Sequence, residues 1–200
     1  MTSPSAAEWP WNQAAHCYEL AGRLEDAGRC YANAGQFPQA ARVFRAAGNL
    51  RATAQMESHA GRHLVAAWIF VHELGDAEAA RQALPPIDET AGNDLLRRLV
   101  EMRCALAEGA PADTVLPVLA AVQDHLGAPG DLVWTSTFEE WGVAVAEAAN
   151  RFDQVALTYA AAVRGGDDAA AERWRRWAQD RFGQRIVIPQ ATPAATRGTA

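Results

Sequence analysis

Four glycines in the first third of the chain are spaced thirteen residues apart, and each of them follows an alanine. They are Gly22, Gly35, Gly48 and Gly61. A fixed period is the mark of a repeat architecture. This regularity constrains the fold strongly, because each repeat must form the same local structure and bury equivalent side chains.

Each thirteen-residue step also carries small and large side chains at fixed offsets. A small residue comes first, at Ala14, Ala27, Ala40, Thr53 and Ala66. Four residues later an aromatic ring follows at Tyr18, Tyr31, Phe44 and Phe70, with Glu57 as the exception. Residues at i and i+4 lie on one stripe of an α-helix. We therefore predict that these four aromatic residues form the core of the repeats.

The alanine–glycine pair that closes each step predicts the end of a helix. Glycine adopts the left-handed conformation that terminates a helix without steric cost. A step then contains a helix of about nine or ten residues and a tight turn. Such a helix is unstable alone, so it must bury its stripe against neighbouring helices. The sequence predicts an all-α fold, an α-solenoid of short antiparallel helices.

The predicted helices cover residues 12–21, 25–34, 38–47, 51–60, 64–74 and 77–84. The register slips by one residue at Leu74-Gly75. The segment 64–74 is apolar almost all round, so we expect it to be buried on more than one side.

The pattern Ala14-x3-Tyr18-x2-Ala21 and its counterparts from Ala27 and Ala40 resemble the second helix of tetratricopeptide repeats. The segments YELAG, YANAG and FRAAG are equally similar to the helical repeats of soluble NSF-attachment proteins and of the clathrin and coatomer legs. A tetratricopeptide unit spans about 34 residues. Two steps here span twenty-six, so shorter helices are expected. The resemblance covers 9–84 and extends to 139–163, and it implies a protein-binding role.

We divide the chain into a flexible leader (1–8), regular helical repeats (9–84), further helical hairpins that continue the solenoid (85–184) and a flexible tail (185–200). The boundary is placed at Pro85-Pro86 because prolines end regular helices. Later helices are expected near 134–149, 152–164 and 168–182. Asp113 is expected to cap one helix, and Asp167 or Asp168 the last. The segment 185–188 is expected to be extended.

Composition narrows the choice of function. All eighteen basic residues are arginine, which indicates a GC-rich, bacterial genome, and the net charge of −6 argues against a general nucleic-acid binder. The chain shows neither a secretory signal nor an apolar run long enough to span a membrane, so a cytoplasmic location is expected. Cys17 and Cys30 occupy equivalent repeat positions, and we expect both to be small core residues without a disulfide.

Two histidine patterns suggest an enzymatic alternative. His72-Glu73-Leu74-Gly75-Asp76 differs by one residue from the H-E-x-x-H zinc-protease helix. His59 and His63 are four residues apart, but Gly61 ends a helix between them. We therefore favour a structural interpretation and assign no catalytic, cofactor or metal-binding residue. The alternative is a metal-dependent hydrolase that uses His59, His63, His72 and Glu73.

The last predicted helix combines arginine with tryptophan. Its candidate partner-binding residues are Arg173, Trp174, Arg175, Arg176, Trp177 and Arg181. One interpretation is a capping helix whose tryptophans close the core of the solenoid. A second is an anchor for a partner protein, since Trp and Arg are enriched among interface hot spots. A third is an accessory site for nucleic acid, through stacking and phosphate contacts.

These patterns together predict a non-enzymatic adaptor or scaffold within a bacterial multiprotein assembly. It would need no cofactor and would bind one or more proteins with an acidic contact surface, whereas membranes and nucleic acid are not expected as partners. Exposed residues at variable repeat positions would line its groove. The groove candidates are Glu57, Arg23, Arg51 and Arg62. The sequence leaves the oligomeric state open.

Overall fold

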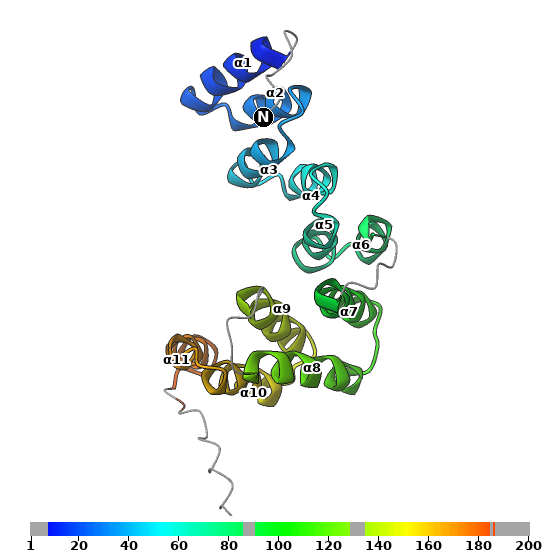
Figure 1. Cartoon of the computed structure of the whole chain (residues 1–200), viewed down its shortest axis with the longest axis vertical. Coiled ribbons are helices and arrows are strands. Elements are labelled where there is room, and N and C mark those ends of the chain that lie inside the picture. Colours follow the sequence, from blue (N-terminus) through cyan, green and yellow to red (C-terminus); the bar gives the residue numbers. More distant parts are fainter. Residues whose placement is uncertain (1–7, 86–90, 129–134, 185, 187–200) are drawn as a thin grey trace, which may run out of the picture. The chain divides into compact units, whose positions relative to one another are not determined.

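The structure is a computed structural model of the 200-residue chain. It describes residues 8–85, 91–128, 135–184 and 186, without the side chains of 8, 9 and 91–93. These residues form eleven α-helices, one π-helix and one 3-10 helix, with no strand among them (Figure 1). Within each of the two units described next, helices adjacent in the sequence pack against one another. The predicted all-α fold is therefore confirmed.

The chain divides into two compact units, Met1–Ala110 and Pro111–Ala200. The predicted boundary at Pro85-Pro86 lies inside the first unit, and Pro86 is outside the described residues, as are 1–7 of the predicted leader and 187–200 of the predicted tail. The extended segment expected at 185–188 also falls outside them, apart from Ile186. In the described part of the chain, no helix is long and apolar enough to cross a membrane.

The first unit is a succession of short helices. They are α1 (Glu8–Leu20), α2 (Leu24–Asn33), α3 (Phe37–Ala46), α4 (Leu50–His59), α5 (His63–Trp68), the π-helix η1 (Ile69–Glu73), α6 (Ala77–Ala83) and α7 (Ala91–Ala107). Each α-helix packs against the next one along the chain. The starts of α2, α3, α4 and α5 are thirteen residues apart.

The second unit is built around one central helix. Its elements are the 3-10 helix η2 (Ala112–Val115), α8 (Leu116–Gly127), α9 (Thr135–Ala148), α10 (Phe152–Arg164) and α11 (Ala169–Phe182). Helix α10 packs against α8, α9 and α11. The core includes Phe138, Leu119, Val122, Val145 and Val155, each at most 1% exposed. The last three helices begin and end within about one residue of their predicted positions.

The turns between the first helices share one hydrogen-bonded motif. Gly35 has φ +72°, and its N–H donates a hydrogen bond to the carbonyl of Ala32 at 3.0 Å. The N–H of Gln36 donates to the carbonyl of Tyr31 at 2.9 Å. This pair of bonds is a Schellman motif with glycine in the left-handed conformation. The same bonds and positive φ recur at Gly22, Gly48 and Gly61. The predicted helix stops are confirmed.

Replacing Gly35 with alanine should lower the free energy of unfolding by about 1–2 kcal/mol, the cost of a left-handed L-residue. No atom lies within 4 Å of a Cβ placed there, so the cost is one of backbone conformation alone. Asn150 is the matched case, because it has φ +55° in an equivalent turn of the second unit. Asn150→Gly should therefore stabilise. Urea denaturation of both variants measures the effects, and equal signs would contradict this explanation.

The predicted register slip coincides with the π-helix. Gly75 lies fourteen residues after Gly61, one more than the usual step. The single helix expected over 64–74 is instead α5 followed by η1, where the N–H of Leu74 bonds to the carbonyl of Ile69 at 3.2 Å. A π-turn spans one residue more than an α-turn. The extra residue is thus absorbed within the helix, before the glycine stop.

The repeat aromatics are buried to different degrees. Phe44 and Phe70 are 5% and 7% exposed, whereas Tyr18 and Tyr31 are half-buried. The hydroxyl of Tyr31 donates a hydrogen bond to Glu19 Oε2 at 3.0 Å. Burial is the main cause that raises the pKa of Tyr31. The two tyrosines therefore lie at the border between the core and a polar surface.

With α5 and η1 counted as one continuous helix, ion pairs on the surface link helices that are two apart in the sequence. Arg42 of α3 contacts Glu19 of α1 at 2.6 Å, and Arg45 of α3 contacts Glu73 of η1 at 2.9 Å. Arg51 of α4 likewise reaches the carboxylate of Asp76, the N-cap of α6, at 2.9 Å. Exposed pairs of this kind contribute little each. They show, however, that alternate helices lie within side-chain reach.

Candidate interaction surface

Trp174 of α11 belongs to the core of the second unit. It is 4% exposed, its ring stacks on Trp177 with the centroids 5.3 Å apart, and Tyr159 of α10 lies 6.1 Å away. Its Nε1 donates a hydrogen bond to the carbonyl of Ile186 at 2.7 Å. Burial raises the pKa of Tyr159 to about 12. Trp174 thus closes the space between α10 and α11, and the carbonyl of Ile186 satisfies its indole N–H.

Three further rings continue from Trp174 to the surface, and we name them the aromatic edge: Phe152, Trp177 and Phe182. The centroid of Phe152 lies 6.0 Å from that of Trp177 and 5.6 Å from that of Phe182. Trp177 is half-buried and donates from Nε1 to Glu147 Oε1 at 2.8 Å. Phe182 is 42% exposed. The aromatic edge therefore presents an apolar ring to solvent on a fixed support.

Arg173 is half-buried and forms an ion-pair network with one buried and one exposed carboxylate. Its Nε and Nη2 donate to the two carboxylate oxygens of Glu139 at 2.6 and 2.7 Å, and Nη2 also reaches Asp167 Oδ2 at 2.5 Å. Glu139 is only 7% exposed. The hydrogen bond to Glu139 is the main cause that raises the pKa of Arg173, and the bond from Arg173 lowers the pKa of Asp167. Arg173 therefore links α11 to α9 and to the turn before α11.

The turn before α11 also supplies its cap. The N–H of Ala169 bonds to Asp167 Oδ1 at 3.0 Å, whereas Asp168 makes no side-chain cap bond. Of the two aspartates predicted for this role, Asp167 is the one that caps the helix. The carboxylate of Asp167 accepts hydrogen bonds from the N–H of Ala169 and from Arg173, so it fixes the first turn of α11.

The other three arginines of α11 remain at the surface. Arg175 pairs with Glu172 on the same helix, and the guanidinium of Arg181 lies 4.9 Å from the centroid of Phe152, in a cation–π contact. Within the described part of the chain, Arg176 makes no hydrogen bond or ion pair. All three are exposed. Positive charge thus lies on the helix that carries the exposed ring of Phe182.

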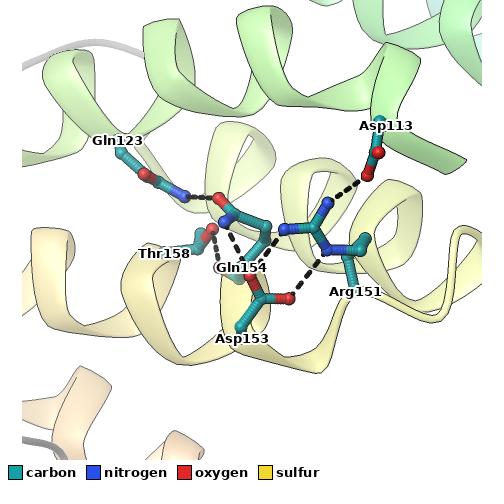
Figure 2. A network of polar contacts seen from close by, with 6 residues as sticks. All are labelled: Asp113, Gln123, Arg151, Asp153, Gln154 and Thr158. Carbon is teal, nitrogen blue, oxygen red and sulfur yellow. Dashed lines mark hydrogen bonds and ion pairs between the residues drawn. The ribbon is translucent and has the colours of Figure 1, made fainter.

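A polar network fixes the start of α10, next to Phe152 (Figure 2). Arg151 donates to Asp113 Oδ1 at 2.5 Å and, through Nε and Nη2, to the two oxygens of Asp153 at 3.0 and 2.8 Å. The bond from Arg151 is the main cause that holds the pKa of Asp153 well below its ordinary value. Gln154 donates to Asp153 at 2.9 Å and accepts from Gln123 of α8 at 3.1 Å. The network therefore holds α10 against α8 and η2.

The expectation that Asp113 caps a helix is wrong. Asp113 lies inside η2, and α8 begins after Val115, whose side chain makes no cap bond. The carboxylate of Asp113 accepts from Arg151 instead, as Figure 2 shows. The physical reason is that the chain enters α8 through a 3-10 turn, so the aspartate is part of that turn and does not precede the helix.

Replacing Arg173 with methionine should lower the free energy of unfolding by about 1–3 kcal/mol, the cost of leaving a buried polar group without its partner. The group left behind is the carboxylate of Glu139. Urea denaturation measures the effect. Arg175→Met is the control and should change stability little, because Arg175 forms an exposed pair with its own helix. Adding Glu139→Gln to Arg173→Met should recover part of the loss; no recovery would contradict the role given to Glu139.

The residues of the hydrolase alternative have separate neighbours. His59 stacks on Phe37 with centroids 5.1 Å apart, and His72 stacks on Trp68 at 4.8 Å. Nδ1 of His63 lies 3.3 Å from Ser58 Oγ, and Glu73 accepts two hydrogen bonds from Arg45. Among the described residues, no group of three or more His, Cys, Asp or Glu side chains is placed to hold a metal ion.

The groove candidates of the first unit are engaged in ion pairs. Arg23 contacts Asp26 at 2.5 Å, and Arg62 contacts Glu57. Arg51 pairs with Asp76 as described above. A ligand that used these side chains would have to break pairs that already exist.

The sequence identified most of the surface residues on α11, since they are close together in the chain. It did not identify Phe152, which comes from α10 and joins Trp177 only through packing. The available signal was its place directly after a helix-ending turn, at the exposed end of a hairpin.

Comparisons of the chain with protein-family models, with curated proteins and with solved structures found no match.

Proposed function

We propose that this protein is a non-enzymatic adaptor or scaffold that binds another protein within a bacterial assembly. In this proposal the first unit is an α-solenoid similar to tetratricopeptide repeats, with a thirteen-residue period. The sequential packing of short helices supports it, as do the equal spacing of four helix starts and the recurrent Schellman turns. Helical stacks of this kind present extended surfaces to partners.

The observation that carries the proposal is the set of exposed side chains on α11, three arginines and the ring of Phe182. Arg175, Arg176 and Arg181 are exposed, and the ring of Phe182 is 42% exposed. Arginine and aromatic side chains are enriched among residues that dominate binding energy. The ring of Phe182 packs edge-on against Phe152 and Trp177. Because these contacts already restrict its side chain, Phe182 would lose little conformational entropy when a partner binds.

Charge suggests the kind of partner. The whole chain has a net charge of −6, whereas α11 contains four arginines against Glu172 and Asp180. An acidic protein surface would be attracted to this helix and repelled by the remaining surface, which sets the orientation of the complex. Trp174 and Arg173, which the sequence placed in the same binding set, would act by holding α11 in place, Trp174 in the core and Arg173 through its pair with Glu139 of α9.

Binding to synthetic peptides tests this function. The probes are peptides of equal length that combine glutamate with an aromatic residue, and serine-substituted versions of them. We expect the acidic aromatic peptides to bind and the double variant Arg175→Glu/Arg176→Glu to weaken binding at least about tenfold, or 1.4 kcal/mol. Arg29→Glu/Arg98→Glu, at exposed sites in the first unit, is the charge-matched control and should not weaken it.

Phe182→Ala should also weaken binding of the same peptides. Leu157→Ala is its control, because Leu157 of α10 is exposed to a similar extent, 47% against 42%. Fluorescence polarisation gives both affinities. Equal binding by the arginine double variant and the wild type at physiological salt would exclude α11 as the contact surface.

A further inference from the structure

The polar contacts between alternate helices of the first unit lie along one edge of it. Helices α1, α3 and α5–η1 end where α2, α4 and α6 begin, at the tight turns 20–24, 46–50 and 73–77. We name the side of the first unit that carries these turns the polar edge. The turns 33–37 and 59–63 lie at the other ends of the same helices and form the opposite edge.

Helix α3 connects α1 to η1 at the polar edge. Arg42 reaches Glu19, near the end of α1, at 2.6 Å. Arg45 donates to both carboxylate oxygens of Glu73, the last residue of η1, at 2.9 and 3.1 Å. Residues three apart are neighbours on the surface of a helix. The positive charges of α3 therefore lie between two acidic helix ends and contact both.

Helix α4 connects α2 to α6 in the same way. Its N-cap Asn49 donates from Nδ2 to Glu25 Oε1 at 3.0 Å, and Arg51 reaches Asp76, the N-cap of α6, at 2.9 Å. Asn49 and Asp76 each follow a glycine stop directly, whereas Glu25 and Arg51 each come three residues after one. The same two repeat positions thus form this contact twice, each time between helices two apart.

Contacts at the opposite edge join neighbouring helices instead. His59, the last residue of α4, stacks on Phe37, the first residue of α3, with the ring centroids 5.1 Å apart. Arg62, the N-cap of α5, pairs with Glu57 of α4. Each of these contacts stays within one step of the stack. The two edges therefore differ in how they connect alternate helices.

We propose that the polar edge is an electrostatic clamp that bends the first unit, so that ionic strength controls its curvature. The curvature of a helix stack follows from a small rotation at each repeat. A contact between alternate helices spans the helix between them, so contacts confined to one edge shorten that edge. Salt screens exposed charges, whereas the apolar contacts between neighbouring helices carry no charge to screen.

The clamp acts on the bend and not on the fold itself. Exposed ion pairs contribute little stability each, and the core between neighbouring helices does not depend on them. That core contains small side chains, such as Ala27, Ala40 and Ala54, each 0% exposed. Small side chains leave room for a slight rotation of one helix on the next. Because the contacts of the polar edge all pull in the same direction, their effects on the bend add.

Electron–electron double resonance between two nitroxide labels on the full chain measures the length of each edge. The labels at the polar edge are attached to Leu20→Cys/Glu78→Cys, at the end of α1 and the start of α6. Those at the opposite edge are attached to Asn33→Cys/Gln82→Cys, near the ends of α2 and α6. All these positions are exposed.

The native cysteines require one further change. Cys17, which was expected in the core, is exposed, so Cys17→Ser is introduced in every labelled chain. Cys30 and Cys104 are buried and need no replacement. Circular dichroism must show that each labelled chain keeps its helix content.

We expect the 20–78 distance to shift to longer values between about 0.01 M and about 1 M sodium chloride, over which the Debye length falls from about 30 Å to about 3 Å. The 33–82 distance should stay the same or become shorter, because the opposite edge has no such clamp among the described residues. A 20–78 distance that is equal at low and high salt would overturn the proposal.

The variant Arg42→Gln/Arg45→Gln/Arg51→Gln separates the clamp from other effects of salt. It should show the longer 20–78 distance already at low salt and lose the response. A charge-matched control replaces Arg23, which pairs within its own helix, Arg62 and exposed Arg98 with glutamine. This control should respond to salt like the wild type. If the two triple variants behave alike, the polar edge is not a clamp. None of these outcomes bears on peptide binding by α11.

Discussion

Replacing Phe44 with alanine is expected to lower the free energy of unfolding by about 3–5 kcal/mol, as for other large aromatic truncations in packed cores. Phe44 of α3 is 5% exposed and lies directly over Gly28 of α2, where an added Cβ would be 2.7 Å from the ring. The ring therefore fills the contact between the two helices, and the neighbouring backbone cannot close the cavity. Urea denaturation followed by circular dichroism gives the change.

The companion variant Gly28→Ala tests the same contact from the other side. It should cost about 1–3 kcal/mol through overpacking, because its Cβ would collide with the ring of Phe44. Combining Gly28→Ala with Phe44→Leu should cost less than the sum of the two single changes, since residues in contact are not additive. Strict additivity would show that the ring and the glycine do not share this space.

Replacing Gly165 with alanine is expected to destabilise the second unit by about 3 kcal/mol, the upper part of the range for overpacking. Gly165 is the C-cap of α10 and has an ordinary helical φ of −71°. A Cβ there would overlap the carbonyl oxygen of Leu126 in α8 and lie 3.4 Å from that of Ala128. The atoms that the new Cβ would overlap belong to the backbone, so the overlap can be removed only if α8 and α10 move apart.

Gly127→Ala is the matched control for this contact. Gly127 ends α8 on the other side of the same contact, and a Cβ placed there finds its nearest atom, in the Arg164 side chain, at an ordinary 3.6 Å. This change should be neutral or stabilising by about 0.5–1 kcal/mol, the gain of alanine over glycine in a helix. Thermal melting of both variants compares them; equal effects would mean that the approach of α8 and α10 is not what requires Gly165.

The local features of the fold could be predicted from the sequence because neighbours in the chain control them. A Schellman turn uses bonds between residues three and five apart, such as Gly35 with Ala32 and Gln36 with Tyr31. Its glycine is required by backbone sterics alone. Helix ends in the repeats, and the slip at Gly75, could therefore be located without knowledge of the packing.

Features that join distant residues were decided by the tertiary structure. Arg173 and Glu139 are 34 residues apart, and their pairing depends on how α9 and α11 meet. The sequence alone does not distinguish Arg173 from Arg176, although Arg173 pairs with the buried carboxylate of Glu139 and Arg176 is exposed. Charge and residue type are properties of the chain, whereas burial is a property of the packed helices.

Cys17 illustrates the same limit within the repeats. Its register equals that of Cys30, so the sequence assigns both to one kind of environment, yet Cys17 is exposed and Cys30 is buried. The repeat pattern determines which side of each helix is apolar. Whether that side is covered depends on the presence of a neighbouring helix, and among the described residues no helix precedes α1.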